Sequence, residues 1–285
     1  MKRISVQDIM TRKVVGVTPE TPLSEVIRLM SVKKIGSIVI IDKEKPIGII
    51  TIRHILKITE KCTPPASLRA KDLMSQPVQT VEPDVNLRNA SILMLQKGIK
   101  KLVVVENEKL IGLVTTTDIE RVFMPFDSPF DILHMDSSSV ALRDEFQTDM
   151  ERKLVENIMT KDVKTVNNLM KVNEIARIMN DTKIGSLIVM RDKKPIGIVT
   201  DLHIVRHIMN NGMDPCKLKA EDAMEELISI NPEESLKNAL EKMISNTVKK
   251  LGVIDSNNSL VGIITTTDFL VYYRSLLFRQ KIIEK

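Results

Sequence analysis

One pattern recurs four times along this 285-residue chain. Each copy ends in a glycine, two aliphatic residues and a threonine, at 48–51, 112–115, 197–200 and 262–265. A methionine precedes each glycine by 38 residues, at Met10, Met74, Met159 and Met224, so successive copies are 64, 85 and 65 residues apart. Matched landmarks at fixed spacings are the signature of a repeat architecture. The chain is therefore predicted to fold as four copies of one unit.

The repeats form two pairs. Repeats one and three share Lys-Ile-Gly-Ser, at 34–37 and 183–186, whereas repeats two and four share Lys-Lys-Leu, at 100–102 and 249–251. The wider middle spacing indicates an insertion between repeats two and three. We predict repeats at 1–60, 68–122, 153–210 and 218–275, with an inter-module linker at 123–152. Each pair is expected to fold as a separate module.

Every repeat has the same order of predicted elements. In repeat one, a β-rich run at 14–17 precedes a helix whose apolar residues follow the spacing i, i+3, i+4, i+7; they are Leu23, Val26, Ile27 and Met30. Two apolar runs, 37–41 and 47–51, then flank a polar segment, which is typical of a β-hairpin. A second helix follows the threonine. The predicted fold class is α/β (α+β), with four β-α-β-β-α units in two pseudo-symmetric tandem pairs.

The charge of the chain is uneven. The net charge is +5, but residues 127–151 hold seven acidic residues and one basic residue, which sum to −6 and leave +11 on the remainder. A basic body favours anionic partners, either nucleic acid or small anions such as nucleotides. Aromatic residues are only 3% and tryptophan is absent, which weighs against the base-stacking surfaces of single-strand binders.

Several classes of protein are disfavoured by the sequence. No apolar run approaches the roughly 20 residues of a membrane span, and no apolar stretch follows the N-terminal basic residues as in a secretory signal. The two cysteines, Cys62 and Cys216, form no C-x-x-C pair, so zinc or thioredoxin-type chemistry is not indicated. We expect two unpaired thiols, no metal, and a reducing, cytoplasmic setting.

The repeats resemble the CBS domain, named after cystathionine β-synthase. The resemblance rests on the β-α-β-β-α order, the tandem pairing and the G-h-h-T-x-x-D ending at 112–118 and 262–268. It covers nearly the whole chain except the linker, and the four-repeat plan is similar to that of the γ subunit of AMP-activated protein kinase. In this family two repeats form a module with two clefts, and the clefts commonly bind adenine nucleotides or related adenosyl ligands.

The resemblance implies that the T-x-x-D residues contact phosphate and ribose. They are Thr115, Thr117 and Asp118 in repeat two and Thr265, Thr267 and Asp268 in repeat four. The first turn of a helix favours phosphate through its unpaired N–H groups, and a carboxylate can accept both ribose hydroxyls. The same spacing is also that of a capping box, in which the acid accepts the N–H of the cap residue. A structural role for both copies is therefore the alternative.

Repeats one and three depart from this ending, because His54 and His203 stand where the aspartate is expected. A neutral imidazole cannot chelate a diol through two acceptor oxygens. Asp201 stands two positions before His203 and is not expected to substitute. We therefore predict one adenosine site in each pair, built on Asp118 and Asp268.

Further candidate residues surround these sites. In the kinase γ subunit, basic residues just before the second strand reach nucleotide phosphates, which here implies Lys100, Lys101, Lys249 and Lys250; solvated surface charge is the alternative. The residues predicted to flank the adenine are Ile35, Gly36, Val78, Thr80, Ile184, Gly185, Ile228 and Ile230. A glycine there permits close approach of a flat base, whereas β-bulges and core packing are the alternatives.

The sequence favours a stand-alone regulatory, energy-sensing protein that binds AMP, ADP or ATP between paired repeats and transmits the ligand state to a partner protein. No kinase signature, P-loop or nucleophile elbow is present, so no enzymatic activity is expected. The alternatives are a nucleic-acid-binding CBS protein and a binder of another adenosyl ligand such as S-adenosylmethionine. A homodimer is one expected assembly, and no membrane partner is indicated.

Overall fold

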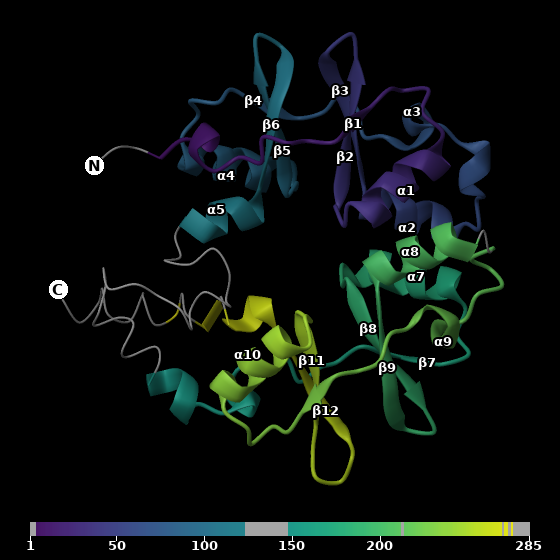
Figure 1. Cartoon of the computed structure of the whole chain (residues 1–285), viewed down its shortest axis with the longest axis vertical. Coiled ribbons are helices and arrows are strands. Elements are labelled where there is room, and N and C mark those ends of the chain that lie inside the picture. Colours follow the sequence, from purple (N-terminus) through teal and green to yellow (C-terminus); the bar gives the residue numbers. More distant parts are fainter. Residues whose placement is uncertain (1–3, 123–147, 212–213, 270, 273–274, 276–285) are drawn as a thin grey trace. The chain divides into compact units, whose positions relative to one another are not determined.

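The protein was analysed as a computed structural model, which describes residues 4–122, 148–211, 214–269, 271–272 and 275 (Figure 1). Within these residues, each repeat contributes one three-stranded sheet, in the orders β1-β2-β3, β4-β5-β6, β7-β8-β9 and β10-β11-β12. Helices precede and follow the paired strands of each sheet. The predicted fold class of four mixed α/β repeats is confirmed.

Repeat one illustrates how the sequence forms the unit. The short strand β1 (Gly16–Val17) runs parallel to β2 (Ser37–Asp42), which pairs antiparallel with β3 (Lys45–Thr51). The hairpin turn places Lys43 and Glu44 at φ 46° and 69°, the left-handed conformation that tight two-residue turns require. Helix α1 (Leu23–Val32) connects β1 to β2, and α2 (Ile52–Glu60) follows β3 directly.

The other repeats follow the same order. Repeat one begins with η1 (Val6–Asp8); repeat two comprises η2 (Pro65–Ser67), α3 (Ala70–Leu73), β4 (Thr80–Val81), α4 (Leu87–Lys97), β5 (Lys101–Glu106), β6 (Lys109–Thr115) and α5 (Thr116–Val122). Repeat three comprises η4 (Val155–Asn157), β7 (Thr165–Asn167), α7 (Val172–Thr182), β8 (Ser186–Arg191), β9 (Lys194–Thr200) and α8 (Asp201–Asn211). Repeat four comprises α9 (Ala220–Ala223), β10 (Ser229–Ile230), α10 (Leu236–Ser245), β11 (Lys250–Ile254) and β12 (Leu260–Thr265).

The apolar stripes identified in the sequence form the cores. All four stripe residues of α1 are fully buried and pack with Ile38, Ile40 and Ile50 of the repeat-one hairpin. The matching stripes of α7 and α10 are likewise buried. Burying one large aliphatic side chain stabilises the folded state by about 2 kcal/mol. These stripes are therefore the main stabilising feature of each unit.

The chain divides into two compact units. The first holds residues 1–123, 169–186 and 200–223, and the second holds 124–168, 187–199 and 224–285. In the first unit, α2 packs against α7 and α8, and α1 packs against α8 (Figure 1). Val205 of α8 is fully buried in the core of repeat one. The first unit therefore unites repeats one and two with helices of repeat three.

Within each pair, the opening segment of one repeat lies on the sheet of the other. Backbone bridges join Thr11 to Leu113 and Ser75 to Ile49 in the first unit. The second unit repeats this arrangement between Thr160 and Ile263 and between Glu225 and Ile198. The segments that precede the first strand of each repeat are therefore part of the contact between paired repeats.

Most of the predicted acidic linker, residues 123–147, lies outside the described residues. Its end is helical, and Met150 is buried in the core of repeat four. Asp149 accepts a 2.6 Å hydrogen bond from the Tyr272 hydroxyl, and Glu151 pairs with Lys237 at 3.0 Å. The acidic residues at this end therefore anchor the chain to repeat four.

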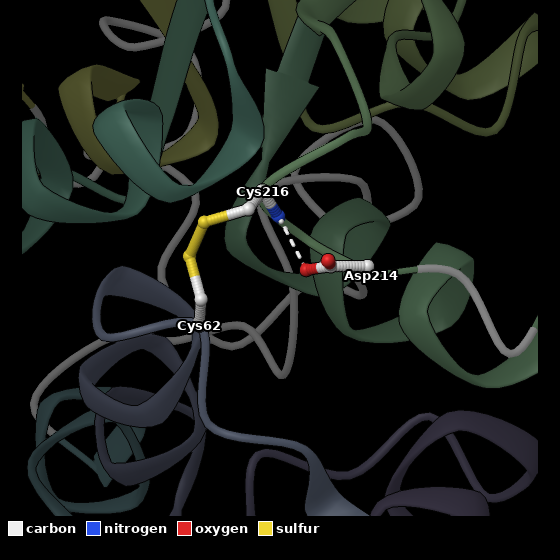
Figure 2. Close-up of side chains that lie close together, drawn as sticks. All are labelled: Cys62, Asp214 and Cys216. Atoms are coloured by element: carbon white, nitrogen blue, oxygen red, sulfur yellow. Dashed lines mark hydrogen bonds between the residues drawn. A yellow bond between two sulfur atoms is a disulfide. The ribbon is translucent and has the colours of Figure 1, made fainter.

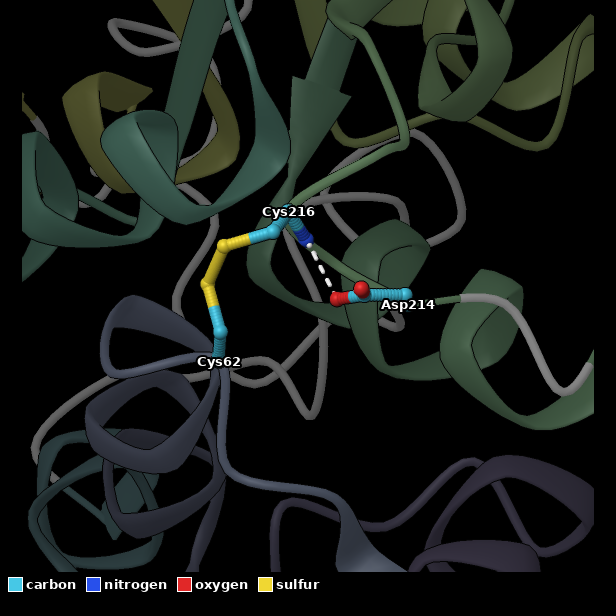
Figure 3. The surroundings of a disulfide bond; sticks show 3 residues. All are labelled: Cys62, Asp214 and Cys216. Carbon is cyan, nitrogen blue, oxygen red and sulfur yellow. Dashed lines mark hydrogen bonds between the residues drawn. A yellow bond between two sulfur atoms is a disulfide. The ribbon is translucent and has the colours of Figure 1, made fainter.

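The expectation of two unpaired thiols is wrong. Cys62 and Cys216 form a disulfide, with their Cα atoms 5.8 Å apart (Figures 2 and 3). The two cysteines are 154 positions apart in the sequence, and the packing of α2 against α7 and α8 brings their segments together. No local pattern encodes such a long-range contact.

Candidate functional site

The T-x-x-D residues of repeat two form a cap at the start of a helix. Thr115 ends β6, and its backbone N–H and hydroxyl donate to Asp118 Oδ2 at 2.8 and 2.7 Å. The Asp118 N–H donates in return to Thr115 Oγ1 at 3.3 Å. Repeat four has the same arrangement, since Thr265 donates twice to Asp268 Oδ2 at 2.7 Å. The capping-box alternative therefore holds for both aspartates, in which Oδ2 accepts the hydrogen bonds of the cap.

The neighbouring threonines differ in exposure. Thr117 and Thr267 are exposed, whereas Thr115 and Thr265 are half-buried. The exposed hydroxyls lie one position before the capping aspartates and are open to solvent. They are thus accessible to an added ligand, whereas the half-buried pair already serves the cap.

Lys101 lies at one of the contacts between the two repeats of the first pair. It stands at the first position of β5 in repeat two, and its ammonium donates to Ser37 Oγ of repeat one at 3.1 Å. A Cβ on Gly36 would lie 3.5 Å from the same Nζ. Burial lowers the pKa of Lys101, and the Asp118 carboxylate offsets part of this effect. Three predicted site residues, Lys101, Asp118 and Gly36, thus lie near one another.

The other three candidate lysines are placed differently. Lys100 and Lys249 have exposed side chains, and their carbonyls accept the N–H groups of Thr116 and Thr266 at 3.0 Å. Lys250 is half-buried at the start of β11.

His54 takes the place of the capping aspartate in repeat one. Its Nδ1 accepts the Thr51 N–H at 3.2 Å, and its Nε2 lies 3.1 Å from Ser75 Oγ. Because Nδ1 accepts, the neutral tautomer carries its proton on Nε2 and donates it to Ser75. Burial, and to a smaller extent the charge of Lys57, lowers the pKa of His54. The imidazole is therefore a neutral cap that also reaches repeat two.

Repeat three is capped differently. The His203 N–H donates to Thr200 Oγ1 at 3.2 Å. Asp201 lies beside Gly185, since a Cβ on that glycine would be 3.3 Å from Asp201 Oδ2. At the equivalent position in repeat one, Ile52 lies beside Gly36. At this position repeat one therefore has an apolar side chain, Ile52, and repeat three an acidic one, Asp201. The T-x-x-D motif gives no information on this difference.

The predicted adenine-flanking residues fall into four groups. Ile230 is 2% exposed and belongs to the core, so core packing accounts for it. Ile35, Val78 and Ile228 are partly buried and pack against core clusters, and Ile184 is also half-buried. Thr80 is exposed on β4. Gly36 and Gly185 are the members that adjoin polar side chains.

Ser37 was not singled out as a candidate, although it belongs to the repeated Lys-Ile-Gly-Ser sequence. It is 8% exposed, and the Lys101 hydrogen bond satisfies its hydroxyl. The recurrence of serine at 37 and 186 is the signal that could have identified it.

One group of side chains in the described part of the chain has the composition of a metal site. The ligand atoms of Cys62, Asp214 and Cys216 lie within 4.8 Å of one another (Figure 2). The two sulfur atoms are bonded to each other, so neither is a thiolate in this state.

None of the helices among the described residues has both the length and the apolar character that a bilayer span requires.

The fold and the repeated motif define a tandem CBS protein. The CBS domain family matches residues 6–61, 70–124, 155–210 and 220–275, which together form most of the chain. The chain belongs to the CBS domain family.

Two proteins are similar in sequence to this chain. An uncharacterized protein of Methanopyrus kandleri, MK0525, is 42% identical over 125 residues, 43% of this chain and 64% of that protein. An uncharacterized protein of Methanocaldococcus jannaschii, MJ1404, is 25% identical over 95% of this chain and 62% of its own length. The chain thus spans less than two thirds of either relative.

A solved structure shows the same fold. Protein MJ1225 of Methanocaldococcus jannaschii, described as a proposed archaeal homologue of γ-AMPK, aligns with a TM-score of 0.69 at 20% sequence identity. The alignment covers 95% of this chain and all of that one. The four-repeat plan is therefore shared over nearly the full length.

Proposed function

We propose that this protein is a regulatory adenine-nucleotide sensor rather than an enzyme. AMP, ADP or ATP binds between paired CBS repeats, and the bound state is read by a partner protein. Adenosyl ligands are typical of the family that the chain belongs to. A ligand that contacts both repeats favours one relative packing, and its differential affinity for two packings shifts their populations.

The observation that carries this proposal is the placement of Lys101. Its ammonium is held at the junction of repeats one and two, within reach of Ser37 and close enough to Asp118 for mutual attraction. A buried cation is costly unless a partner stabilises it, and a phosphate would do so more strongly than a serine hydroxyl. In this proposal Lys101 moves from Ser37 to the phosphate when the ligand binds.

Asp118 supplies the ribose contact in the same proposal. In this proposal its carboxylate accepts a ribose hydroxyl while Oδ2 remains in the cap. Gly36 admits the flat base because it has no side chain to stand between the base and the backbone. Asp268 has the corresponding role in the second pair, where it makes the same cap.

Lys101→Ala tests the phosphate contact. Isothermal titration with ATP and with adenosine should show ATP weakened roughly tenfold and adenosine little changed, because only the phosphates contact the ammonium. Lys100→Ala is the matched control, since that neighbouring lysine is exposed. Equal weakening of both ligands would mean that Lys101 acts through the fold. S-adenosylmethionine bound more tightly than all three nucleotides would replace the proposed ligand.

A further inference from the structure

Cys62 stands at a backbone position that normally favours glycine. It follows the end of α2 and has a φ of 54°. Two backbone hydrogen bonds close the helix here: Cys62 N–H donates to the Thr59 carbonyl at 3.0 Å, and Thr63 N–H donates to the Ile58 carbonyl at 2.9 Å. Glycine adopts this conformation without steric cost, as Gly98 does after α4 at φ 63°, although Lys34, Lys183 and Thr247 also follow helices at positive φ. A cysteine there carries a conformational cost.

Cys216 is held by a turn that is anchored to α7. Its N–H donates to Asp214 Oδ1 at 2.9 Å (Figure 3). Two residues after Cys216, the Leu218 carbonyl accepts the N–H of Val172 at 2.8 Å. Val172 is the first residue of α7. The disulfide therefore ties the C-terminal end of α2 to a turn that is fixed on the N-terminal end of α7.

Side-chain hydrogen bonds also join α2 to α7. Arg53, near the start of α2, donates to the carbonyls of Met179 and Lys183 at 3.1 and 2.8 Å. Asn180 donates to Glu60 at 3.0 Å near the other end of α2. Helix α2 is thus held at both ends, and the disulfide is the covalent element of this contact.

The same helix begins next to the candidate site. The Ile52 N–H, in the first turn of α2, donates to the Gly36 carbonyl at 3.3 Å, and Gly36 adjoins the Lys101 ammonium. Any shift of α2 along α7 therefore reaches the backbone that lines the proposed base position.

We propose that Cys62–Cys216 is a reversible redox lock that fixes α2 against α7 and thereby sets the affinity of the first-pair site. The link to affinity rests on the proposed function. Both cysteines are half-buried rather than fully buried, as attack by a small dithiol requires. A thiolate of the dithiol attacks one sulfur and forms a mixed disulfide, and its second thiol then closes a ring. The protein gains two electrons and two protons as two thiols, and the dithiol becomes a cyclic disulfide.

The test compares the full chain in its oxidised state with the chain reduced by dithiothreitol under anaerobic conditions. Mass spectrometry after alkylation counts the free thiols. Thermal unfolding, hydrogen exchange of α2 and α7, and AMP titration are then measured in both states. The double variant Cys62→Ser, Cys216→Ser is the control, because reductant cannot change it.

Reduction should lower the melting temperature by on the order of 5–10 °C, since a crosslink over this sequence separation restricts the unfolded chain strongly. Exchange should quicken in α2 and α7, and AMP affinity should change about fivefold or more. Reoxidation should restore all three values. The double variant should behave like the reduced protein in every condition.

Three results would overturn parts of this proposal. Unchanged melting and exchange after reduction would exclude the lock. Changed melting with equal AMP affinity would exclude the link to the site. Uptake of one Zn²⁺ per reduced chain, absent in the double variant and accompanied by recovered melting temperature, would make the group with Asp214 a metal site instead. If no AMP binds in either state while melting and exchange respond, the lock stands and the proposed function fails.

Discussion

Met74 of repeat two lies directly on Gly48 of repeat one, so closely that a Cβ on the glycine would stand 2.9 Å from the methionine Cγ and closer still to its Sδ. The same relationship joins Met10 to Gly112, Met224 to Gly197 and Met159 to Gly262. Each methionine thus contacts the glycine of the other repeat in its pair. The two landmarks recur at matched spacings because each pair of repeats packs through two such contacts.

Gly48→Ala should therefore destabilise the protein by about 1–3 kcal/mol, because the new methyl group overpacks a filled contact. Urea unfolding followed by circular dichroism measures the change. Gly36→Ala is the matched control, since a Cβ there meets its nearest neighbour at 3.5 Å, and its stability should be nearly unchanged. Adding Met74→Ala to Gly48→Ala should restore part of the loss, which a double-mutant cycle detects. Purely additive effects would contradict the contact.

His54 should make stability depend on pH. Its folded pKa is lowered, chiefly by burial, so in weakly acidic solution the unfolded chain binds a proton that the folded chain does not. The stabilising contribution is therefore full above the unfolded pKa of about 6.5 and falls as the pH drops toward the lower folded pKa. Urea unfolding at several pH values between about 5 and 8 measures this dependence.

His54→Asn is the control for this effect. An asparagine keeps an oxygen that accepts the Thr51 N–H but does not titrate in this range. The stability difference between the two proteins should therefore move in favour of the variant as the pH falls. A difference that is constant with pH would show that His54 does not titrate on unfolding in this window.

Arg53→Ala should loosen the contact between α2 and α7. The substitution removes two hydrogen bonds to carbonyls at the end of α7, for which we expect a loss of roughly 1–2 kcal/mol. Lys57→Ala removes an exposed charge from the same helix and should change stability by less than about 0.5 kcal/mol. Thermal unfolding of the two variants distinguishes a specific contact from a general charge effect, and equal losses would rule out the contact.

The conformation at Cys62 leads to a prediction about its replacement. Cys62→Gly and Cys62→Ala both remove the disulfide, but only glycine adopts a positive φ without steric cost. Cys62→Gly should therefore be more stable than Cys62→Ala by about 1 kcal/mol. Unfolding of both variants by urea, with reductant present, measures the difference. A more stable alanine variant would contradict the left-handed backbone at this position.

Much of the fold was predictable because it is encoded locally. The stripe of α1 and the hairpin of β2 and β3 follow from periodicity within a few residues. The crossed contact of Met74 with Gly48 was not predictable, since the spacing of landmarks gives no information on which repeat each one touches. The disulfide was missed for the same reason, because it depends on the packing of α2 against α7.

The candidate site was predictable in composition but not in arrangement. The sequence identified Asp118 and Lys101, but their spacing was compatible with a ligand contact or with a cap. The structure places Oδ2 of Asp118 in the cap and Lys101 against Ser37. Ser37 was missed because a serine at the start of a strand is chemically unremarkable until a charged partner from another repeat is seen beside it.

Calorimetric titration of the full chain with AMP, ADP and ATP tests the central claim most directly. We expect one adenine nucleotide bound in each pair of repeats. In the double variant Asp118→Asn, Asp268→Asn, each asparagine still offers an oxygen to the cap N–H but lacks the charge that binds ribose, so affinity should fall roughly ten- to hundredfold with the fold preserved. Absence of binding, four sites per chain, or tight binding retained in this variant would contradict the account.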